Sequence, residues 1–370
     1  MKLLMTAWSF YPAQEGGPSN ALYWLATGLA SSGYIMRVVT TDRWLPQGSV
    51  PIDEWYRLNG FDVIYQSVQQ SETFLYEELD KCDVLLTDGI CKLRYFRLAL
   101  NALKKNKKVI LSPRGELFDS AINHKGRLFG MVKKAFILYM RMAFRNRVIF
   151  HATSEEEKKT VFRYMGKKAH VVLIPNYMIL PDKIEVDTNT ILEPYLLYVG
   201  RLNQIKNIHI ILSGLVKSPA FMNGNVKFKL AGEKTGEYYE SLVHQAKELG
   251  ISDRVEFLGL VTGTEKDRLY AGAKCLLLMS KSENFGNVIV EALSQGTPAI
   301  ASQGTPWQQL DEKGAGWWID AKAECVGETV EKLLKLDESV YRGMRESAYA
   351  LSREFDIFTN IGKWVEIIGR

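Results

Sequence analysis

Cysteine is scarce in this sequence, and the four residues present stand far apart, with no C-x-x-C pair (Cys82, Cys91, Cys275, Cys325). This spacing argues against a zinc site or a disulfide framework and favours a reducing compartment. No run reaches the 18 apolar residues that a membrane span needs. The N-terminus, "MKLLMTAWSFYPAQEGG", lacks the sustained apolar core and small-residue cleavage site of a signal peptide. We therefore expect a cytoplasmic protein.

Several binding signatures are also missing. The net charge is +5, a mild basic excess that suits anionic ligands but is too small to indicate nucleic acid. The five histidines show no metal-ligand spacing, and the dinucleotide fingerprint G-x-G-x-x-G does not occur at the Gly16-Gly17 turn. Neither a resident metal nor a dinucleotide cofactor is expected.

Short apolar runs alternate with helical patterns along the whole chain. The first series runs from "KLLMTAW" to "VVLIPN", and a second begins at "YLLYVG" after the polar segment 181–194. Such non-alternating Val, Ile and Leu runs are typical of strands buried on both faces of a parallel sheet. The pattern predicts two α/β domains of doubly wound, Rossmann-like layout facing each other, at 1–180 and 190–353.

The segment "SENFGNVIVEA" sets two acids eight positions apart. Glu283 is predicted in a loop after a buried strand, and Glu291 on the helix that follows. Such loops lie at the carboxyl edge of a parallel sheet, where α/β proteins bind ligands. The amides of Phe285, Gly286 and Asn287 would be unpaired donors at a helix N-terminus, which favours a phosphate. Taken alone, the same spacing is also compatible with a solvated loop glutamate and a solvated glutamate on the surface of a helix.

Basic residues follow the first strand of the second series. In "GRLNQIKN", Arg201 and Lys206 are predicted at the same sheet edge as Glu283. Two fixed cations there would neutralise a diphosphate, although such residues alone are more often solvated surface charges. In the first half, Gly16 and Gly17 open a helix with Pro18 at its start.

Together these motifs carry a family resemblance. The segments "GGPSNALYWLATGL", "HATSEEE", "GRLNQIKN", "LAGE" and "SENFGNVIVEALSQGTPAI" resemble the retaining glycosyltransferases of family 4, which have the GT-B fold. "TPWQQL" and "GAGWWI" resemble bacterial members that build surface polysaccharides such as lipopolysaccharide, capsule or exopolysaccharide. The resemblance implies a UDP- or GDP-sugar donor held by the C-terminal domain. It also implies a saccharide or lipid-linked saccharide acceptor held by the N-terminal domain, and a final helix, 354–370, that crosses back to that domain.

The resemblance also implies roles for individual residues. Glu291 would bind the ribose of the donor, and Glu283 would lie beside its sugar. Arg201 and Lys206 would stabilise the departing diphosphate. The loop residues that complete the implied donor site are Gly16, Gly17, Asn284, Phe285, Gly286 and Asn287. The resemblance also implies transfer with retention of the anomeric configuration. No D-x-D motif occurs in the chain, so no metal is expected to hold the diphosphate.

One departure from the family pattern concerns a histidine that many members place near the donor sugar. Here "LSPRGELFDSAINHKG" has Arg114 at that place, so Arg114 is predicted to take over a catalytic contact to sugar or phosphate. His124 is a possible substitute, although a lone loop histidine is more often merely solvated. His151 is predicted to be a packed strand-end residue rather than a base.

The segment 125–147 has seven Lys or Arg and no acid, with large apolar residues among them (Phe129, Val132, Phe136, Tyr139, Met140). It is predicted either to lie on an anionic membrane surface or to be a core-packed helix with a solvated basic face. Two alternatives to the transferase also stay open. One is a GT-B nucleotide-sugar epimerase, and the other is a catalytically silent sugar-nucleotide-binding subunit.

Overall fold

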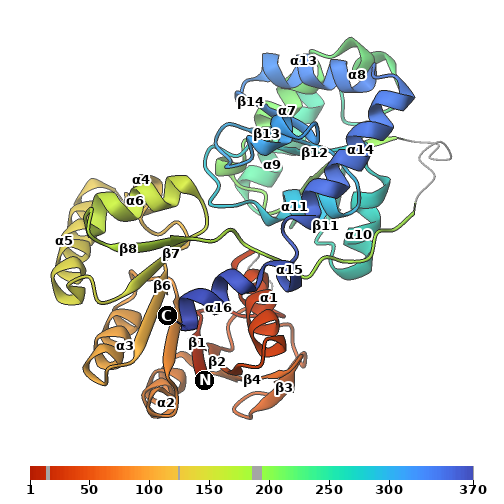
Figure 1. Cartoon of the computed structure of the whole chain (residues 1–370). Helices are drawn as coiled ribbons and strands as arrows, with labels where there is room; N and C mark the ends of the chain where they lie inside the picture. The colour runs from red at the N-terminus through yellow and green to blue at the C-terminus, as the bar shows by residue number, and fades with distance from the viewer. Residues whose placement is uncertain (14–16, 124–125, 186–193, 370) are drawn as a thin grey trace. The chain divides into compact units, whose positions relative to one another are not determined.

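A computed structural model describes residues 1–13, 17–123, 126–185 and 194–369. The chain divides into two compact units (Figure 1). Unit 1 comprises Met1–Ile179 and Ile357–Arg370, and unit 2 comprises Leu180–Asp356. The predicted α/β fold is confirmed in both units, since each contains a largely parallel sheet accompanied by helices.

Unit 1 contains an eight-stranded sheet in the order β3-β4-β2-β1-β5-β6-β7-β8. Its strands are β1 Lys2–Thr6, β2 Ile35–Thr41, β3 Tyr56–Leu58, β4 Phe61–Gln66, β5 Val84–Asp88, β6 Lys108–Ser112, β7 Ile149–Ala152 and β8 His170–Leu173. Its helices are α1 Gly17–Ser31, α2 Val68–Asp80, α3 Leu93–Lys104, α4 Asp119–Ile122, α5 Arg127–Phe144, α6 Glu155–Met165, α15 Ile357–Asn360 and α16 Gly362–Gly369. The strand order reverses direction between β1 and β5, which makes this the switch point of a doubly wound sheet.

Unit 2 contains a six-stranded parallel sheet in the order β11-β10-β9-β12-β13-β14. Its strands are β9 Tyr195–Val199, β10 Lys227–Ala231, β11 Val255–Gly259, β12 Cys275–Leu278, β13 Ala299–Ser302 and β14 Gly316–Ile319. Its helices are the 3₁₀ turn η1 Gln204–Lys206, α7 Ile208–Leu215, α8 Pro219–Asn223, α9 Glu237–Glu248, α10 Gly263–Gly272, α11 Asn287–Ser294, α12 Gln309–Glu312, α13 Ala323–Leu334 and α14 Glu338–Arg353. Here the switch point lies between β9 and β12.

Strand β3 was not predicted from the sequence. It pairs antiparallel with β4 through the turn at Asn59 and Gly60, which have φ angles of +41° and +91°. Asn-Gly between two strands is the usual sequence of a tight hairpin with both central residues at positive φ. The signal was therefore present in "RLNGF".

The C-terminal segment returns to unit 1, as predicted, but as two short helices rather than one. The Ile357 amide donates to the Met178 carbonyl at 2.9 Å. The Lys108 ammonium donates to the Ile368 carbonyl at 2.7 Å, and the Trp364 ring lies 4.5 Å from the His151 ring. The end of the chain is therefore an integral part of unit 1.

Candidate active site

Two loops meet at the switch point of unit 2, one after β9 and one after β12. The Lys281 amide donates to the Ile205 carbonyl at 2.7 Å and joins them. Beside this link, Lys206 Nζ lies 2.5 Å from Glu283 Oε2, and both side chains are largely buried, at 16% and 19% exposed. Ser280 Oγ donates to the same carboxylate oxygen at 3.0 Å. The structure thus brings Lys206 and Glu283, 77 positions apart, into direct contact.

The turn into α11 depends on Gly286, whose φ of +88° lies in the left-handed region. A Cβ there would lie 3.3 Å from Glu283 Cγ and 3.3 Å from Trp307 Nε1, so glycine also allows the close approach. Trp307 Nε1 donates to the Phe285 carbonyl at 2.5 Å. The rings of Phe285, Trp307 and Phe355 pack with centroids 5.2–5.7 Å apart. This aromatic cluster fixes the loop that carries Glu283.

Asn284 lies between the acid and the glycine. Its Oδ1 is buried and has no hydrogen-bond partner among the described residues. Buried polar atoms are normally paired, because an unpaired one costs about 1–3 kcal/mol. The unpartnered oxygen is thus a feature of the loop that packing alone does not explain.

Glu291 lies on α11 and is only 7% exposed. Its Oε2 accepts a hydrogen bond from the Tyr270 hydroxyl at 2.8 Å and lies 3.1 Å from Lys266 Nζ. Burial, together with the Glu291 charge, raises the pKa of Tyr270 well above its usual value, so the hydroxyl remains a donor at neutral pH. The carboxylate is therefore held in one orientation by two side chains of α10.

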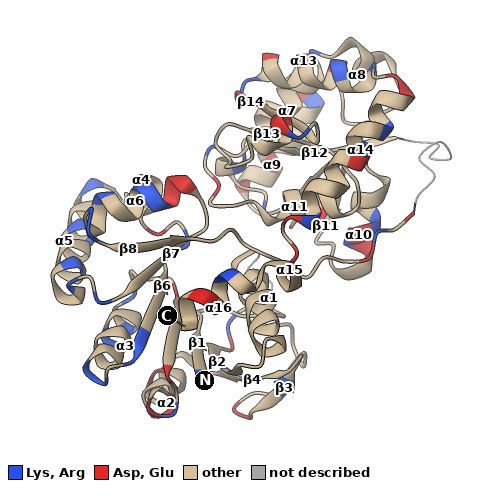
Figure 2. Cartoon of the chain, viewed as in Figure 1, with Lys and Arg blue, Asp and Glu red and all other residues tan. Residues whose placement is uncertain are grey.

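Arg201 follows β9 and is exposed. Its carbonyl accepts from the Tyr198 hydroxyl at 2.9 Å, which fixes the backbone beside the switch point. Burial, and then the Glu283 charge, raises the pKa of Tyr198, which keeps that donor protonated. Figure 2 shows the distribution of such charges over the chain. Arg201 therefore has a fixed backbone and a side chain open to an anionic ligand.

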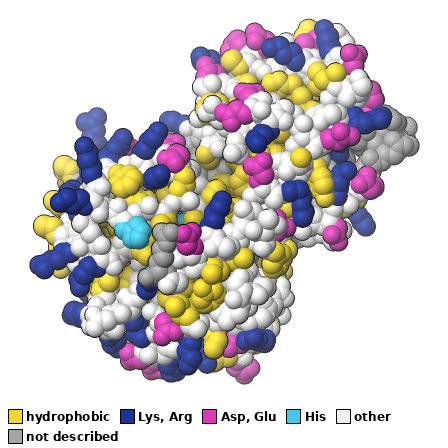
Figure 3. Space-filling model, viewed as in Figure 1, with side chains coloured by type: hydrophobic (Ala, Val, Ile, Leu, Met, Phe, Trp, Pro, Cys, Tyr) yellow, Lys and Arg dark blue, Asp and Glu magenta, His cyan; other side chains and the backbone are white. Residues whose placement is uncertain are grey.

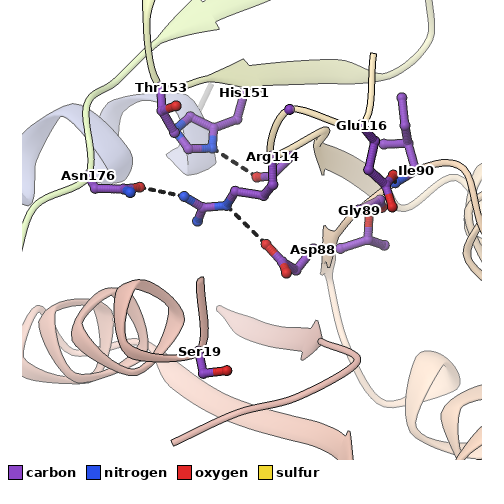
Figure 4. Close-up of polar contacts among 12 residues, drawn as sticks. Ser19, Asp88, Gly89, Ile90, Arg114, Glu116, His151, Thr153 and Asn176 are labelled. Atoms are coloured by element: carbon purple, nitrogen blue, oxygen red, sulfur yellow. Dashed lines mark hydrogen bonds and ion pairs between the residues drawn. The ribbon is translucent and has the colours of Figure 1, made fainter. Parts of the chain in front are cut away.

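Unit 1 has a different polar network at the carboxyl ends of β5, β6, β7 and β8 (Figure 4). Arg114 has a φ of +50°, and its Nε donates to Asp88 Oδ1 at 2.9 Å. Its Nη1 donates to Asn176 Oδ1. Burial raises the pKa of Asp88 to about 6, although the Arg114 charge opposes that rise. The predicted catalytic arginine is thus already held by two acceptors of its own unit.

The other polar groups of this network are also paired. Glu116 accepts from the Ile90 and Cys91 amides at 2.5 and 2.8 Å. Glu157 accepts from the Gly115 amide at 2.6 Å and the Thr153 amide at 2.8 Å. These carboxylates fix the loops after β5, β6 and β7.

His151 is 1% exposed. Its Nδ1 is 2.8 Å from Ser112 Oγ, and its Nε2 is 2.8 Å from the Ile174 carbonyl. Burial, followed by the Arg114 charge, lowers its pKa to about 3. His151 is therefore the neutral, packed strand-end residue that the sequence predicted.

The predicted site residues thus fall into two sets. Arg201, Lys206, Asn284–Asn287 and Glu291 lie in unit 2 with Glu283, whereas Gly17 and Arg114 lie in unit 1. Gly17 is the first residue of α1; Gly16 and His124 lie outside the described residues.

Sequence reasoning missed the supporting residues Ser280, Lys266, Tyr270 and Trp307, and in unit 1 Asp88 and Asn176. Asp88 ends the "DVLLTD" run and Ser280 ends "CLLLMS", so strand-end polar residues were the available signal. The described residues contain no group of three or more His, Cys, Asp or Glu that could hold a metal.

Comparisons with known proteins agree with this architecture. Residues 185–350 match the family model described as "Glycosyl transferases group 1". The chain is 25% identical over 346 residues to an uncharacterized glycosyltransferase, MJ1607, of Methanocaldococcus jannaschii, covering 87% of this chain and 86% of that protein. It is 29% identical to the lipopolysaccharide core biosynthesis glycosyltransferase LpsE of Rhizobium meliloti, over 46% of this chain and 49% of that protein.

Among solved structures, Anabaena Alr3699/HepE in complex with UDP-glucose is similar, with a TM-score of 0.76, 17% identity and full coverage of both chains. At this identity the likeness concerns the fold alone. The family model and the relatives, together with that fold, confirm the resemblance to the GT-B glycosyltransferases.

Proposed function

We propose that this chain is a glycosyltransferase of the GT-B fold that takes a sugar from a UDP- or GDP-sugar bound at the switch point of unit 2. The observation that carries this proposal is the loop pair after β9 and β12. It places Lys206, Glu283 and the unpartnered Asn284 oxygen beside the N-terminus of α11. A helix N-terminus with fixed cations favours the diphosphate of such a donor.

We propose that the transfer retains the anomeric configuration and needs no metal. The acceptor oxygen forms a bond to the anomeric carbon while the bond to the diphosphate breaks, and the acceptor proton leaves with the diphosphate. Arg201 and Lys206 stabilise the charge that develops on the leaving group. Glu283 lies beside the positive charge that develops on the sugar, and Glu291 holds the ribose.

The acceptor is a saccharide or lipid-linked saccharide held by unit 1, in the synthesis of a bacterial surface polysaccharide. The support is the likeness to LpsE, which names lipopolysaccharide core biosynthesis, although the match spans about half the length of that protein. The reaction would take place in the cytoplasm, at the inner face of the cell membrane.

We further propose that α5 lies on that membrane. The described residues contain no helix that is long and apolar enough to cross a bilayer. One face of α5 packs in the core through residues such as Ile137 and Met140, whereas other large apolar side chains are 41–73% exposed: Leu128, Phe129, Met131, Val132, Leu138, Tyr139 and Met142. Figure 3 shows hydrophobic and basic side chains side by side on this part of unit 1. The exposed apolar side chains beside the basic ones support this proposal, and the buried ones agree with core packing of the opposite face. Lys125 lies outside the described residues.

A basic pocket at the end of α5 supports the proposal that this helix lies on the membrane. Its volume is about 460 Å³, and its lining includes Arg141, Arg145, Lys167 and Lys168 but no acid. Each such charge near an anionic membrane contributes about 1 kcal/mol. Lys167→Ser with Lys168→Ser is therefore expected to weaken co-sedimentation with phosphatidylserine liposomes about 30-fold. The matched pair Lys247→Ser with Lys332→Ser, exposed in unit 2, should leave it unchanged.

The experiment that tests the donor proposal is a thermal-shift screen against UDP-, GDP-, ADP- and dTDP-sugars, followed by transfer assays with and without EDTA. A ligand at 100 times its dissociation constant stabilises by about 2.7 kcal/mol. We expect one donor to shift the melting temperature, and turnover to survive the chelator. Loss of turnover with EDTA that manganese restores would remove the metal-free mechanism. Conversion of the donor without an acceptor would favour the epimerase, and binding without any turnover the silent subunit.

A further inference from the structure

The loop after β13 packs directly on the loop that carries Glu283. It contains the first residues of the motif "TPWQQL", to which the proposed function gives no role. The Glu283 amide donates to the Gly304 carbonyl at 2.9 Å, and Trp307 Nε1 donates to the Phe285 carbonyl at 2.5 Å. The loop after β13 therefore holds the backbone of the Glu283 loop at two points, one on each side of a single residue.

The two loops approach each other more closely than a side chain would allow. A Cβ at Gly304 would lie 2.3 Å from the Ser280 carbonyl oxygen and 2.6 Å from that of Lys281. The Ser302 hydroxyl donates to the same Ser280 carbonyl at 2.5 Å, and Ser280 Oγ donates to the Glu283 carboxylate at 3.0 Å. The loop after β13 thus contacts the segment that fixes both the backbone and the carboxylate of Glu283.

A second tryptophan holds the loop after β13. Trp318 belongs to the other motif without a role, "GAGWWI", and lies on β14, which pairs with β13. Its Nε1 donates to the Thr305 carbonyl at 2.9 Å, and the Thr305 hydroxyl donates to the Ser302 carbonyl at 2.7 Å. An indole nitrogen is a donor only, so each tryptophan can serve a backbone carbonyl in this way. The two motifs therefore meet at one loop.

Burial makes the hydrogen bond of Trp307 important for the position of Glu283. The rings of Trp307, Phe285 and Phe355 are all buried and pack against one another. Without the indole N–H, the Phe285 carbonyl loses this donor, and an unpaired buried acceptor costs about 1–3 kcal/mol. The carbonyl can gain another partner only if the loop moves, which displaces Glu283. Misplacement of a reacting group by about 1 Å can lower a rate about 100-fold.

We propose that Trp307 is a positioning residue of the sugar transfer, which acts on the rate through Glu283. Its side chain is 1% exposed, so it acts through the loop and not through a contact with donor or acceptor. Trp318 supports the same loop one step further from the acid. The inference rests on the proposed function, because it names the residue that holds the reacting loop of the same transferase.

The test is a double-mutant cycle on donor turnover. Turnover is measured as release of the nucleoside diphosphate from the donor that the thermal-shift screen identifies, with water or the acceptor taking the sugar. Trp307→Phe keeps an aromatic ring and removes the indole N–H, and it should lower kcat at least about tenfold, by more than it raises the donor KM. In a Glu283→Ala background, the same substitution should lower kcat less than about twofold, because the residue through which it acts is gone.

The matched control is Tyr341→Phe, which removes another hydrogen bond from a buried aromatic side chain to a backbone carbonyl. The Tyr341 hydroxyl donates to the Lys274 carbonyl at 2.8 Å, at the amino end of β12, whereas Glu283 follows the carboxyl end of that strand. The control should lower the melting temperature and leave kcat unchanged. Trp318→Phe, at a partly exposed side chain, should lower kcat by a smaller factor than Trp307→Phe, and only when Glu283 is present.

Equal turnover of Trp307→Phe and the unmodified protein would overturn the inference. An equal fold loss of kcat with and without Glu283 would overturn it as well, because the effect would then not pass through this acid. If Trp307→Phe does not fold, Trp318→Phe decides by the same two criteria. The proposed function fails separately, if the unmodified protein binds no donor and releases no nucleotide.

Discussion

The two units show how differently two similar sheets use their carboxyl edges. In unit 2, the loops after β9 and β12 leave Arg201 exposed and the Asn284 oxygen unpartnered. In unit 1, the loops after β5, β6 and β7 form a network in which Arg114, Glu116 and Glu157 already have partners. The comparison teaches that the fold supplies the position of a site, whereas pairing within the loops decides what remains available to a ligand.

The largest effect is expected from breaking the paired network of unit 1. In Arg114→Ala, the buried Asp88 loses its cation and Asn176 loses its donor, so the unfolding free energy should fall by about 3–5 kcal/mol. The side chains of Arg114 and Asp88 are 8% and 14% exposed. The control is Arg163→Ala, whose ion pair with Asp119 is 65% and 61% exposed and contributes less than about 1 kcal/mol. Urea denaturation measures both. Unchanged stability with lost turnover would instead make Arg114 a catalytic contact.

The same pair predicts a pH dependence. Burial raises the pKa of Asp88 from 3.8 to about 6, against the opposing Arg114 charge. Between these values the folded protein holds a proton that the unfolded chain has lost, so this carboxyl makes the fold less stable as the pH rises through that window. Asp88→Asn imitates the protonated form and should flatten this part of the stability curve. An identical slope in the variant would show that other groups cause it.

The next largest effect separates the two acids of unit 2. Glu291→Ala should mainly raise the donor KM, because a ribose contact is alike in ground and transition states. Glu283→Ala should mainly lower kcat, because its interaction strengthens as charge develops on the sugar. Each loss is on the order of 2–3 kcal/mol, or tens- to a hundredfold. Steady-state kinetics measure both. Reversed effects would exchange the two roles, and unchanged kinetics in both would make the spacing structural.

A smaller effect is expected at Gly286, for which the chain offers a matched control. Gly236 is also a helix N-cap, and its φ of +89° is nearly that of Gly286, but a Cβ there would meet no atom within 4 Å. Alanine should cost both positions about 1 kcal/mol of backbone strain. Only Gly286→Ala pushes against Glu283 and Trp307, so only it should weaken donor binding. Equal donor affinity in the two variants would contradict the role of this turn.

Much of this arrangement could be predicted from the sequence, because it depends on local patterns. The buried strands appear as apolar runs, and the contact of Lys206 with Glu283 follows from both lying after neighbouring strands of one parallel sheet. Gly286 was recognisable as a glycine at the start of a predicted helix, where it lets the backbone approach closely. The sequence did not predict how the side chains around this turn are placed.

The remainder could not be predicted, because it depends on distant packing. Phe355 joins Phe285 and Trp307 from a part of the chain with no local signal for that contact. Lys266 and Tyr270 reach Glu291 from α10, and the partners of Arg114 come from two other strand ends. The final helix was predicted as one element and is two, since its pattern of apolar residues does not reveal the break at Ile361.

The central claim, that unit 2 holds the donor through Lys206, is tested most directly by titrating UDP and GDP into Lys206→Met. Lys247→Met, an exposed lysine in the last turn of α9, is the control. A charge-assisted contact to the diphosphate contributes about 1.5–3 kcal/mol, so its loss predicts roughly 10- to 150-fold weaker nucleotide binding in Lys206→Met. The control should bind the nucleotide as tightly as the unmodified protein. Equal affinity of Lys206→Met and the unmodified protein for the nucleotide would contradict the account.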